Sequence, residues 1–404
     1  MSREERVDVA VVGAGQAGLA TSYWLAEGDM NHVLLERDRP GNSWHDRWDS
    51  FCLVTPNWTL NLPGFPYDGD DPDGFIPRDA IADYVKRYRE FLDAPVQEST
   101  EVLGLTRSDD GWTLTTDRGQ WLARSVVVAT GTFPFPSIPP VAKSIRTDLL
   151  QLHSQKYRQP SALPDGGVLV VGSGQSGAQI VDDLVIEGRE VWFSIGQSGH
   201  GPRRYRGKDI TFWMREIGFS DMPVTEEMRQ RASIMTSGRD GGKDLNLRAF
   251  GRDGVHVIGR VLGIDQATLR LSDDVENVVD AADEVAAQLQ GLVDRHIVEH
   301  GIEAPPANIE PIDWVPGATP TQLDLDSIGI NSLVWATGYH YDFSWIDADI
   351  FDNRGYPQQQ RGVTSEPGLY FIGLHGMHTV GSGLFSGVGA DARHVVNHIS
   401  DTLE

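Results

Sequence analysis

The stretch VVGAGQAGLA, residues 11–20, decides the fold together with a second stretch, VVGSGQSGAQI, residues 170–180. Both have the spacing G-x-G-x-x-G, carried by Gly13, Gly15 and Gly18 in the first glycine loop and by Gly172, Gly174 and Gly177 in the second. In such a loop the first glycine permits a tight turn, the second lets a pyrophosphate approach the backbone, and the third lets the helix pack close to its strand. The flanking segments alternate strand, helix and strand, so the sequence predicts two dinucleotide-binding βαβ units.

The residue that ends the strand after each loop differs between the two units. Glu36 ends HVLLE in the first unit, where a carboxylate can accept both ribose hydroxyls of an adenosine. Ser194 ends EVWFS in the second unit and has no charge to repel a 2′-phosphate, so this unit permits NADP. The following stretch, HGPRRYRGK, offers Arg203 and Arg204 as phosphate ligands, with a solvated loop or internal ion pairs as the alternative.

A stretch of sequence that occurs twice in similar form indicates how the units are joined. RSVVVATG, residues 124–131, returns as NSLVWATG, residues 331–338. We therefore expect the second unit to be inserted into the first, with the two ATG stretches as the crossings. The predicted parts are residues 1–160 and 326–404 for the first unit and 161–325 for the second. Residues 41–78 form a long irregular segment whose aromatic content argues against disorder.

Composition excludes several classes of partner. The chain has 404 residues, of which 40% are hydrophobic and 23% charged, as in ordinary globular proteins. Its net charge of −24 repels nucleic acid and anionic membranes, so neither is an expected partner. No apolar run reaches about 18 residues, and the first glycine loop begins too early to leave room for a signal peptide; we expect a cytoplasmic protein.

The single cysteine, Cys52, excludes an internal disulfide, a C-x-x-C redox pair and a thiolate zinc site. Two histidine pairs, His375 with His378 and His394 with His398, lack the carboxylates that would complete a ligand set, so no metal site is predicted. Two dinucleotide loops without a dithiol have one common explanation. One loop holds a flavin, and the other binds a nicotinamide coenzyme that delivers hydride to it.

The order of these motifs resembles, over nearly the whole chain, the class B flavoprotein monooxygenases, which include flavin-containing and Baeyer–Villiger monooxygenases. The stretch RWDSFCLVTPNWTLNLPGFPY, residues 47–67, narrows the resemblance to bacterial YUCCA-like flavoproteins. The family signature F-x-G-x-x-x-H-x-x-x-Y appears in TDLLQLHSQKY, residues 147–157, with His153 and Tyr157 kept and Thr147 and Leu149 in place of Phe and Gly. The tyrosine at its end departs from the Baeyer–Villiger variant, which has Trp.

Two further departures bear on the coenzyme and the substrate. The arginine that usually follows the second strand is replaced by residues 195–197, IGQ, which puts NADPH preference in doubt. Val380 and Gly381 stand where close relatives carry a basic pair, which points to an altered substrate pocket.

The resemblance implies an α/β fold of two Rossmann-like domains arranged as in glutathione reductase, the second inserted in the first. It implies FAD and NADPH as cofactors, with NADH as a possible substitute. It also implies a C4a-hydroperoxyflavin that oxygenates nitrogen or sulfur of a small molecule, so the expected partners are that substrate and O2. The oligomeric state stays open, a homodimer included.

The candidate residues fall into three groups. The candidate catalytic residues are Asn57, His153, Tyr157 and His378, and further candidates to line the substrate pocket are Trp44, Trp48, Thr55 and Ser382. The candidate cofactor-binding residues are Gly13, Gly15, Gln16, Ala17, Gly18, Glu36, Arg37, Ser43, Trp44, Ala129, Thr130, Gly131, Gly172, Ser173, Gly174, Gln175, Ser176, Gly177, Ser194, Arg203, Arg204, Ala336, Thr337 and Gly338.

Three alternatives to N- or S-oxygenation remain at this point. The chain could be an NAD(P)H-flavin oxidase or reductase that oxygenates nothing, a Baeyer–Villiger enzyme acting on a carbonyl, or a flavin-holding sensor without turnover. The sensor would need neither the second glycine loop nor the arginines, which makes it the weakest of the three.

Overall fold

The first βαβ unit forms the centre of a nine-stranded sheet. The computed structural model describes residues 4–133, 135–225, 228 and 234–403. Strand β1 (Glu4–Val12) pairs in parallel with β2 (His32–Leu35) and with β8 (Gly119–Val128). The apolar run at the end of β1 is buried, as expected for a strand that is covered on both faces. The carboxyl ends of β1, β2 and β8 therefore meet at one edge, where the first glycine loop lies.

A second, five-stranded parallel sheet contains the second glycine loop. Its order is β10 (Leu150–His153), β22 (Ile330–Trp335), β11 (Gly167–Val171), β12 (Val191–Ser194) and β18 (His256–Ile258). Every neighbouring pair in this order is parallel. The α/β class with two Rossmann-type units, predicted from the sequence, is confirmed.

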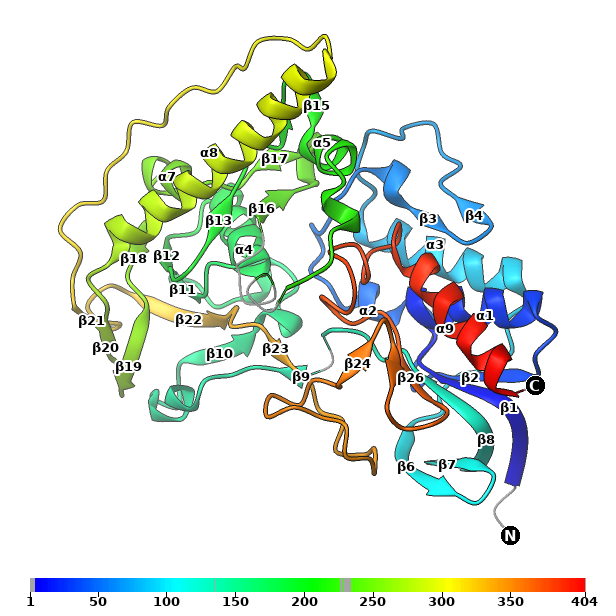
Figure 1. Cartoon of the computed structure of the whole chain (residues 1–404). Coiled ribbons are helices and arrows are strands. Elements are labelled where there is room, and N and C mark those ends of the chain that lie inside the picture. The colour runs from blue at the N-terminus through cyan, green and yellow to red at the C-terminus, as the bar shows by residue number, and fades with distance from the viewer. Residues whose placement is uncertain (1–3, 134, 226–227, 229–233, 404) are drawn as a thin grey trace.

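Helices cover both sheets. Helix α1 (Gln16–Glu27) follows the first glycine loop and packs beside the C-terminal helix α9 (Val388–Leu403), where Trp24 Nε1 donates to Gly389 O at 3.0 Å. Helix α4 (Gln175–Ile186) follows the second loop, and the long α8 (Val275–His300) crosses the second unit. Figure 1 shows the two units beside each other, with the blue, cyan and red parts of the chain in one and the green and yellow parts in the other. The C-terminal segment thus completes the unit in which the chain begins.

The chain passes between the units at two short strands that pair with each other. Strand β9 (Phe135–Pro136) is antiparallel to β23 (Tyr339–His340), directly after the two ATG stretches. Strands β10 and β22 belong to the second sheet, although the predicted boundaries at residues 160 and 326 assigned both to the first unit. We propose that the unit boundaries lie at β9 and β23.

The remaining elements either complete the nine-stranded sheet or surround the two sheets. The helices are α2 (Asn42–His45), α3 (Arg78–Leu92), α5 (Ile210–Glu216) and α7 (Leu247–Arg252). The strands are β3 (Asn61–Leu62), β4 (Phe65–Pro66), β5 (Val96–Gln97), β6 (Val102–Ser108), β7 (Gly111–Thr116), β13 (Gly199–His200), β14 (Arg204–Tyr205), β15 (Lys208–Asp209), β16 (Ile234–Ser237), β17 (Lys243–Asp244), β19 (Val261–Asp265), β20 (Thr268–Leu271), β21 (Gln322–Asp324), β24 (Gln359–Gln360), β25 (Val363–Thr364) and β26 (Leu369–Phe371). Among the described residues, no helix combines the length and apolar character needed to cross a membrane.

Candidate cofactor-binding and active site

The first glycine loop is a tight turn held by the neighbouring strands. Gly13 N donates to Leu35 O at 2.8 Å, and Ala129 N donates to Val12 O at 2.8 Å. Gly13 has a φ of 104°, and a Cβ on it would lie 2.6 Å from Ala129 O. A Cβ on Gly18 would run into the carbonyl of Gly13, whereas one on Gly15 would meet nothing within 4 Å. The first and third glycines are therefore required by the fold, and the second opens space above the loop.

The second glycine loop repeats this geometry. Gly172 N donates to Ser194 O at 3.0 Å, and Ala336 N donates to Val171 O at 2.8 Å. Gly172 has a φ of 110°, and a Cβ on Gly177 would run into its carbonyl. A Cβ on Gly174 would meet nothing within 4 Å. The structure thus has two equivalent loops, each backed by one of the ATG stretches.

Both loops have the features of a pyrophosphate site. Helices α1 and α4 begin after Gly15 and Gly174 without a side-chain cap, and neither has an acidic residue in its first turn. The first backbone N–H groups of each helix thus face open space with the positive end of the helix dipole behind them. The side chain of Gln175 is not available, because its amide group bonds the backbone of Thr236. A dinucleotide fits each loop through backbone contacts.

Glu36 is held at the end of β2 by the loop it follows. Its Oε2 accepts from Ala14 N at 2.8 Å and its Oε1 accepts from Asp38 N at 3.0 Å. The carboxylate is half-buried beside the first glycine loop, as expected for a ribose ligand. The nearby candidates Arg37 and Ser43 are exposed, and Arg37 Nε lies 3.6 Å from Asp38.

The crossings place two more glycines in the left-handed region. Gly131 has a φ of 81° and Gly338 a φ of 83°, and a Cβ on either would meet nothing within 4 Å. Thr337 Oγ1 donates to Ser137 O at 2.5 Å, and Thr130 is exposed. Both ATG stretches therefore present open backbone beside their glycine loops.

Two buried donors in the segment after β2 fit an acceptor-rich cofactor. Trp44 stacks on Phe385 with ring centroids 5.5 Å apart, and its Nε1 has no hydrogen-bond partner in the described part of the chain. Arg47 Nε likewise has none there, and its guanidinium lies 4.8 Å from the centre of the Phe133 ring. Burial lowers the pKa of Arg47, which is partly offset by Tyr339. Such donors are costly unless paired, and the carbonyl and ring nitrogen atoms of a flavin would satisfy them.

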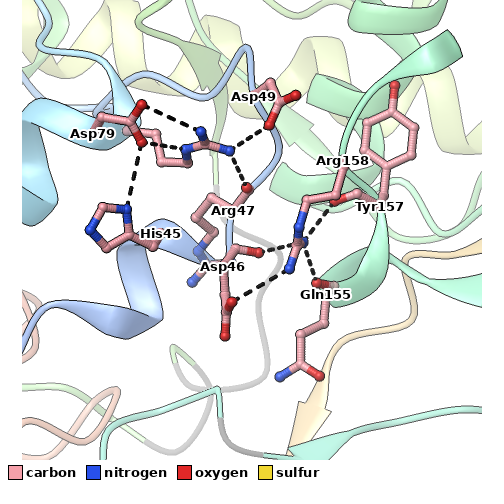
Figure 2. Close-up of polar contacts among 9 residues, drawn as sticks. His45, Asp46, Arg47, Asp49, Asp79, Gln155, Tyr157 and Arg158 are labelled. Carbon is pink, nitrogen blue, oxygen red and sulfur yellow. Dashed lines mark hydrogen bonds and ion pairs between the residues drawn. The ribbon is translucent and has the colours of Figure 1, made fainter. Parts of the chain in front are cut away.

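Figure 2 shows the polar cluster that fixes the position of this segment. Arg158 Nη1 donates to Asp46 O at 2.7 Å, and Asp49 N donates to Arg158 O at 2.8 Å. Arg78 Nη1 bonds both the Asp49 carboxylate, at 2.5 Å, and Arg47 O, at 3.1 Å. These contacts join the segment that carries Arg47 to the stretch between β10 and β11 of the second sheet.

His153 is a buried neutral side chain that holds the second crossing. Its Nδ1 accepts from Gln155 N at 3.2 Å, so Nε2 carries the proton and donates to Gly338 O at 2.9 Å. Only 3% of the residue is exposed, and burial lowers the pKa of its ring. The ring of Tyr339 meets it edge-on, with centroids 5.0 Å apart. His153 therefore positions the crossing through its backbone contacts.

Tyr157 does not have the catalytic placement that the sequence predicted. The residue is 1% exposed, and its Oη donates to Asp183 Oδ2 at 2.7 Å, while Arg239 Nη1 bonds the other carboxylate oxygen at 2.7 Å. Burial raises the pKa of Tyr157 above its ordinary value. The side chain packs against α4 and links it to the stretch between β10 and β11, so its role is structural.

Asn57 is buried, and its side-chain amide forms hydrogen bonds with backbone groups of the irregular segment. Its Oδ1 accepts from Ile76 N at 2.7 Å, and its Nδ2 donates to Asp71 O at 2.8 Å. Two pocket candidates nearby also make local contacts: Thr55 Oγ1 lies 2.7 Å from Thr59 Oγ1, and Trp48 packs edge-on against a phenylalanine ring. A role of Asn57 at the reacting atoms stays a prediction.

His378 lies in the turn before α9. Its backbone N donates to Ser382 Oγ at 3.3 Å, and its carbonyl accepts from Val224 N at 2.9 Å. Ser382 is fully buried, so its hydroxyl fixes this turn, while the half-buried His378 ring stays a candidate to face the substrate. In the described ranges, no group of three or more histidine, cysteine or carboxylate side chains could hold a metal ion.

Arg203 is not free to bind a coenzyme phosphate, and this prediction is wrong. Its Nε and Nη2 donate to the two carboxylate oxygens of Asp209 at 2.7 and 2.6 Å, and its Nη1 donates to Val54 O at 2.7 Å. The residue is 2% exposed and its guanidinium lies 4.6 Å from the centre of the Phe75 ring. The alternative of an internal ion pair holds here. Arg204 is exposed, and it bonds Gly242 O and Gly241 O at 3.3 and 2.8 Å.

Several residues of this site carried no interpretable signal in the sequence. Arg47 lies in a stretch that supported the family resemblance, but the burial of its Nε without a hydrogen-bond partner in the described residues was not evident. Phe385 lies far along the chain and reaches Trp44 only because α9 packs onto the first unit.

Comparisons with known proteins agree with this geometry. The family model described as pyridine nucleotide-disulphide oxidoreductase matches residues 10–216. An uncharacterized CzcO-like oxidoreductase of Geobacillus kaustophilus is 34% identical over 97% of this chain and 98% of its own. The indole-3-pyruvate monooxygenase YUCCA4 of Oryza sativa subsp. japonica is 25% identical, covering 97% of this chain and 87% of its own. A flavin-containing monooxygenase from Stenotrophomonas maltophilia has the same fold, with a TM-score of 0.70 at 19% identity over 99% of this chain and all of its own.

Proposed function

Because the chain belongs to the pyridine nucleotide-disulphide oxidoreductase family, and within it to the class B flavoprotein monooxygenases, we propose that it oxygenates nitrogen or sulfur of a small molecule. Its cofactors are FAD and NADPH. In the balanced reaction, NADPH, O2, a proton and the substrate give NADP⁺, water and the oxygenated substrate. The specific bond that is oxygenated is our proposal.

The observation that carries the proposal is the pair of equivalent loops, each backed by a crossing. Ala129 closes the first loop and Ala336 closes the second, and the chain from each leads directly to the paired strands β9 and β23. Two dinucleotides that extend from their loops toward this junction would bring their reactive rings together. We assign FAD to the first loop because Glu36 suits an unphosphorylated ribose, and NADPH to the second because Ser194 has no charge to repel a 2′-phosphate.

When bound, FAD would supply the two-electron chemistry that activates O2. The residues of the chain bind and orient the reactants and exclude water. The glycine loops position the two pyrophosphates, Glu36 orients a ribose, and the Trp44 indole with Arg47 offers donors to the ring system. His153 keeps the second crossing in place by donating its Nε2 proton to Gly338 O, and burial, which lowers the pKa of the ring, favours the neutral form.

The single cysteine bears on which acceptor receives the electrons of the reduced flavin. A reductase that passes electrons to a disulfide through a dithiol needs two cysteines, and this chain has only Cys52. Cys52 is half-buried, and burial raises the pKa of its thiol, which lowers its reactivity. Oxygen is therefore the acceptor that this site supports best.

The decisive experiment follows oxygen atoms into the product. The purified holoenzyme is supplied with NADPH and ¹⁸O₂ and with a panel of thioethers, amines and ketones. We expect one ¹⁸O atom in a sulfoxide, N-oxide or N-hydroxylated product, with NADPH use coupled to its formation. Hydrogen peroxide as the sole oxygen product would identify an oxidase, and labelled esters from the ketones would identify a Baeyer–Villiger enzyme; either result contradicts the proposal.

A further inference from the structure

The coenzyme site needs a cation that the predicted arginines do not provide. Arg203 forms an ion pair with Asp209, and Arg204 donates to the backbone carbonyls of residues 241 and 242. Directly after β12, where an arginine would face the adenosine ribose, the chain has residues 195–197, IGQ. A dinucleotide whose ribose carries a phosphate would find no positive side chain on this strand.

The turn after the neighbouring strand β18 supplies a cation at the same edge of the sheet. Strands β12 and β18 are parallel, with Ser194 opposite Ile258, so both end at the same level. Ser194 Oγ donates to Gly259 O at 3.0 Å and accepts from Val261 N at 3.2 Å. The turn after β18 is thereby fastened to the last residue of β12, and Arg260 lies at its centre.

Arg260 extends over Gly196, which immediately follows Ile195 after β12. A Cβ placed on Gly196 would lie 3.4 Å from Arg260 Nε and 3.7 Å from its Nη2, so the guanidinium covers the glycine. Gly196 N in turn donates to Ser173 Oγ at 2.9 Å, which joins this turn to the second glycine loop. The charge of Arg260 therefore lies where an arginine directly after β12 would have projected.

The guanidinium of Arg260 is also uncommitted. It is exposed, and within the described ranges it makes no ion pair and no side-chain hydrogen bond. The nearby hydroxyl of Ser272 accepts from the Arg260 backbone N at 2.8 Å and donates to Asp274 at 2.5 Å, so Ser272 bonds the backbone of Arg260 and leaves its guanidinium free. The planar fork of an arginine suits a phosphate, and this guanidinium has no competing partner in the described residues.

We propose that Arg260 binds the 2′-phosphate of NADPH and sets the coenzyme preference of this chain. The inference rests on the proposed assignment of NADPH to the second glycine loop. It replaces the arginine expected directly after β12 by one from the turn after β18, and the sheet places these two strands side by side. Gly196 is part of the arrangement, because a Cβ placed on it would be in van der Waals contact with the guanidinium.

Binding without turnover tests the inference. The dissociation constants of 2′,5′-ADP, 5′-AMP, NADPH and NADH are measured by calorimetry for the wild-type holoenzyme and for Arg260→Ala. We expect the variant to bind 2′,5′-ADP and NADPH about tenfold more weakly or worse and to bind 5′-AMP and NADH as before, because only the first two ligands carry the phosphate. Arg204→Ala is the matched control, an exposed arginine of the predicted cluster that we expect to change neither set.

A second variant tests the position as well as the charge. In Gly196→Arg/Arg260→Ala the cation returns in the turn directly after β12, and we expect most of the lost affinity for 2′,5′-ADP to be restored. Equal weakening of all four ligands, an unchanged Arg260→Ala, or a loss confined to Arg204→Ala would each overturn the assignment. A wild-type protein that binds 5′-AMP as tightly as 2′,5′-ADP would overturn it too, while the labelled-oxygen experiment with NADH would still decide the proposed function.

Discussion

Arg203 and Asp209 form a buried, two-bond ion pair, with Nε and Nη2 of the arginine 2.7 and 2.6 Å from the two carboxylate oxygens. The side chains are 2% and 10% exposed. The pair also joins the two units, because Arg203 Nη1 donates to Val54 O in the first unit. A charged pair in this position thereby helps to hold the two units together.

Arg203→Ala should therefore destabilise the protein and leave coenzyme choice unchanged. Removing one partner of a buried pair leaves an uncompensated charge, which typically costs about 3–5 kcal/mol. We expect a clear fall in the thermal midpoint of the holoenzyme, while Arg204→Ala, at an exposed position, should stay within about 0.5 kcal/mol of the wild type. A normal midpoint together with a selective loss of NADPH binding would restore Arg203 as a phosphate ligand.

Gly15→Val should yield a folded protein without FAD. A Cβ at Gly15 meets nothing within 4 Å, so the added side chain fills only the space above the first glycine loop. The absorbance of the purified variant measures the bound flavin, and circular dichroism measures the fold. Gly18→Ala is the contrast, because its Cβ would run into the Gly13 carbonyl and should lower stability as well. Full flavin in Gly15→Val would show that the first loop is assigned wrongly.

Gly174→Val should keep FAD and lose binding of both nicotinamide coenzymes. Its Cβ also meets nothing within 4 Å, so the change obstructs the second loop without disturbing its backbone. Both coenzymes should be affected because both share the pyrophosphate, in contrast to the selective effect expected at Arg260. Anaerobic bleaching of the flavin by NADPH and NADH provides the measurement. Loss of flavin in this variant would contradict the division between the two loops.

The stability that His153 contributes should fall as the pH falls through its folded-state pKa. Burial lowers this pKa below the ordinary 6.5, so below about pH 6.5 the unfolded chain takes up a proton that the folded chain does not. The neutral ring thus stabilises the fold above pH 6.5 and progressively less below it.

The thermal midpoints of the wild type and His153→Gln, measured from pH 7.5 to 5, test this linkage. We expect the advantage of the wild type to shrink toward low pH. His32, whose pKa is also lowered by burial, is present in both proteins and cancels. An advantage that grows on acidification would mean that His153 is charged in the fold.

The sequence by itself determined the two dinucleotide units and the backbone geometry of their glycine loops. The glycine spacing, the apolar strands and Glu36 are local features within about 30 residues, and the loop geometry follows from which residues tolerate a φ near 100° or a close carbonyl. The insertion of one unit into the other was also predictable, because RSVVVATG and NSLVWATG mark both crossings.

Only the tertiary structure decided how the charged residues are used. A run of arginines is compatible with a phosphate site and with internal ion pairs. Arg203 forms an ion pair because the fold places Asp209 and the carbonyl of Val54 within hydrogen-bond distance of its guanidinium. Tyr157 likewise donates its hydroxyl proton to Asp183 on α4, a contact that the sequence did not reveal. The position of Arg260 depends on the hydrogen-bond register between β12 and β18, which joins residues far apart in the chain. Such pairings are set by packing and by the cost of burying an unpaired charge, and neither can be inferred from local sequence.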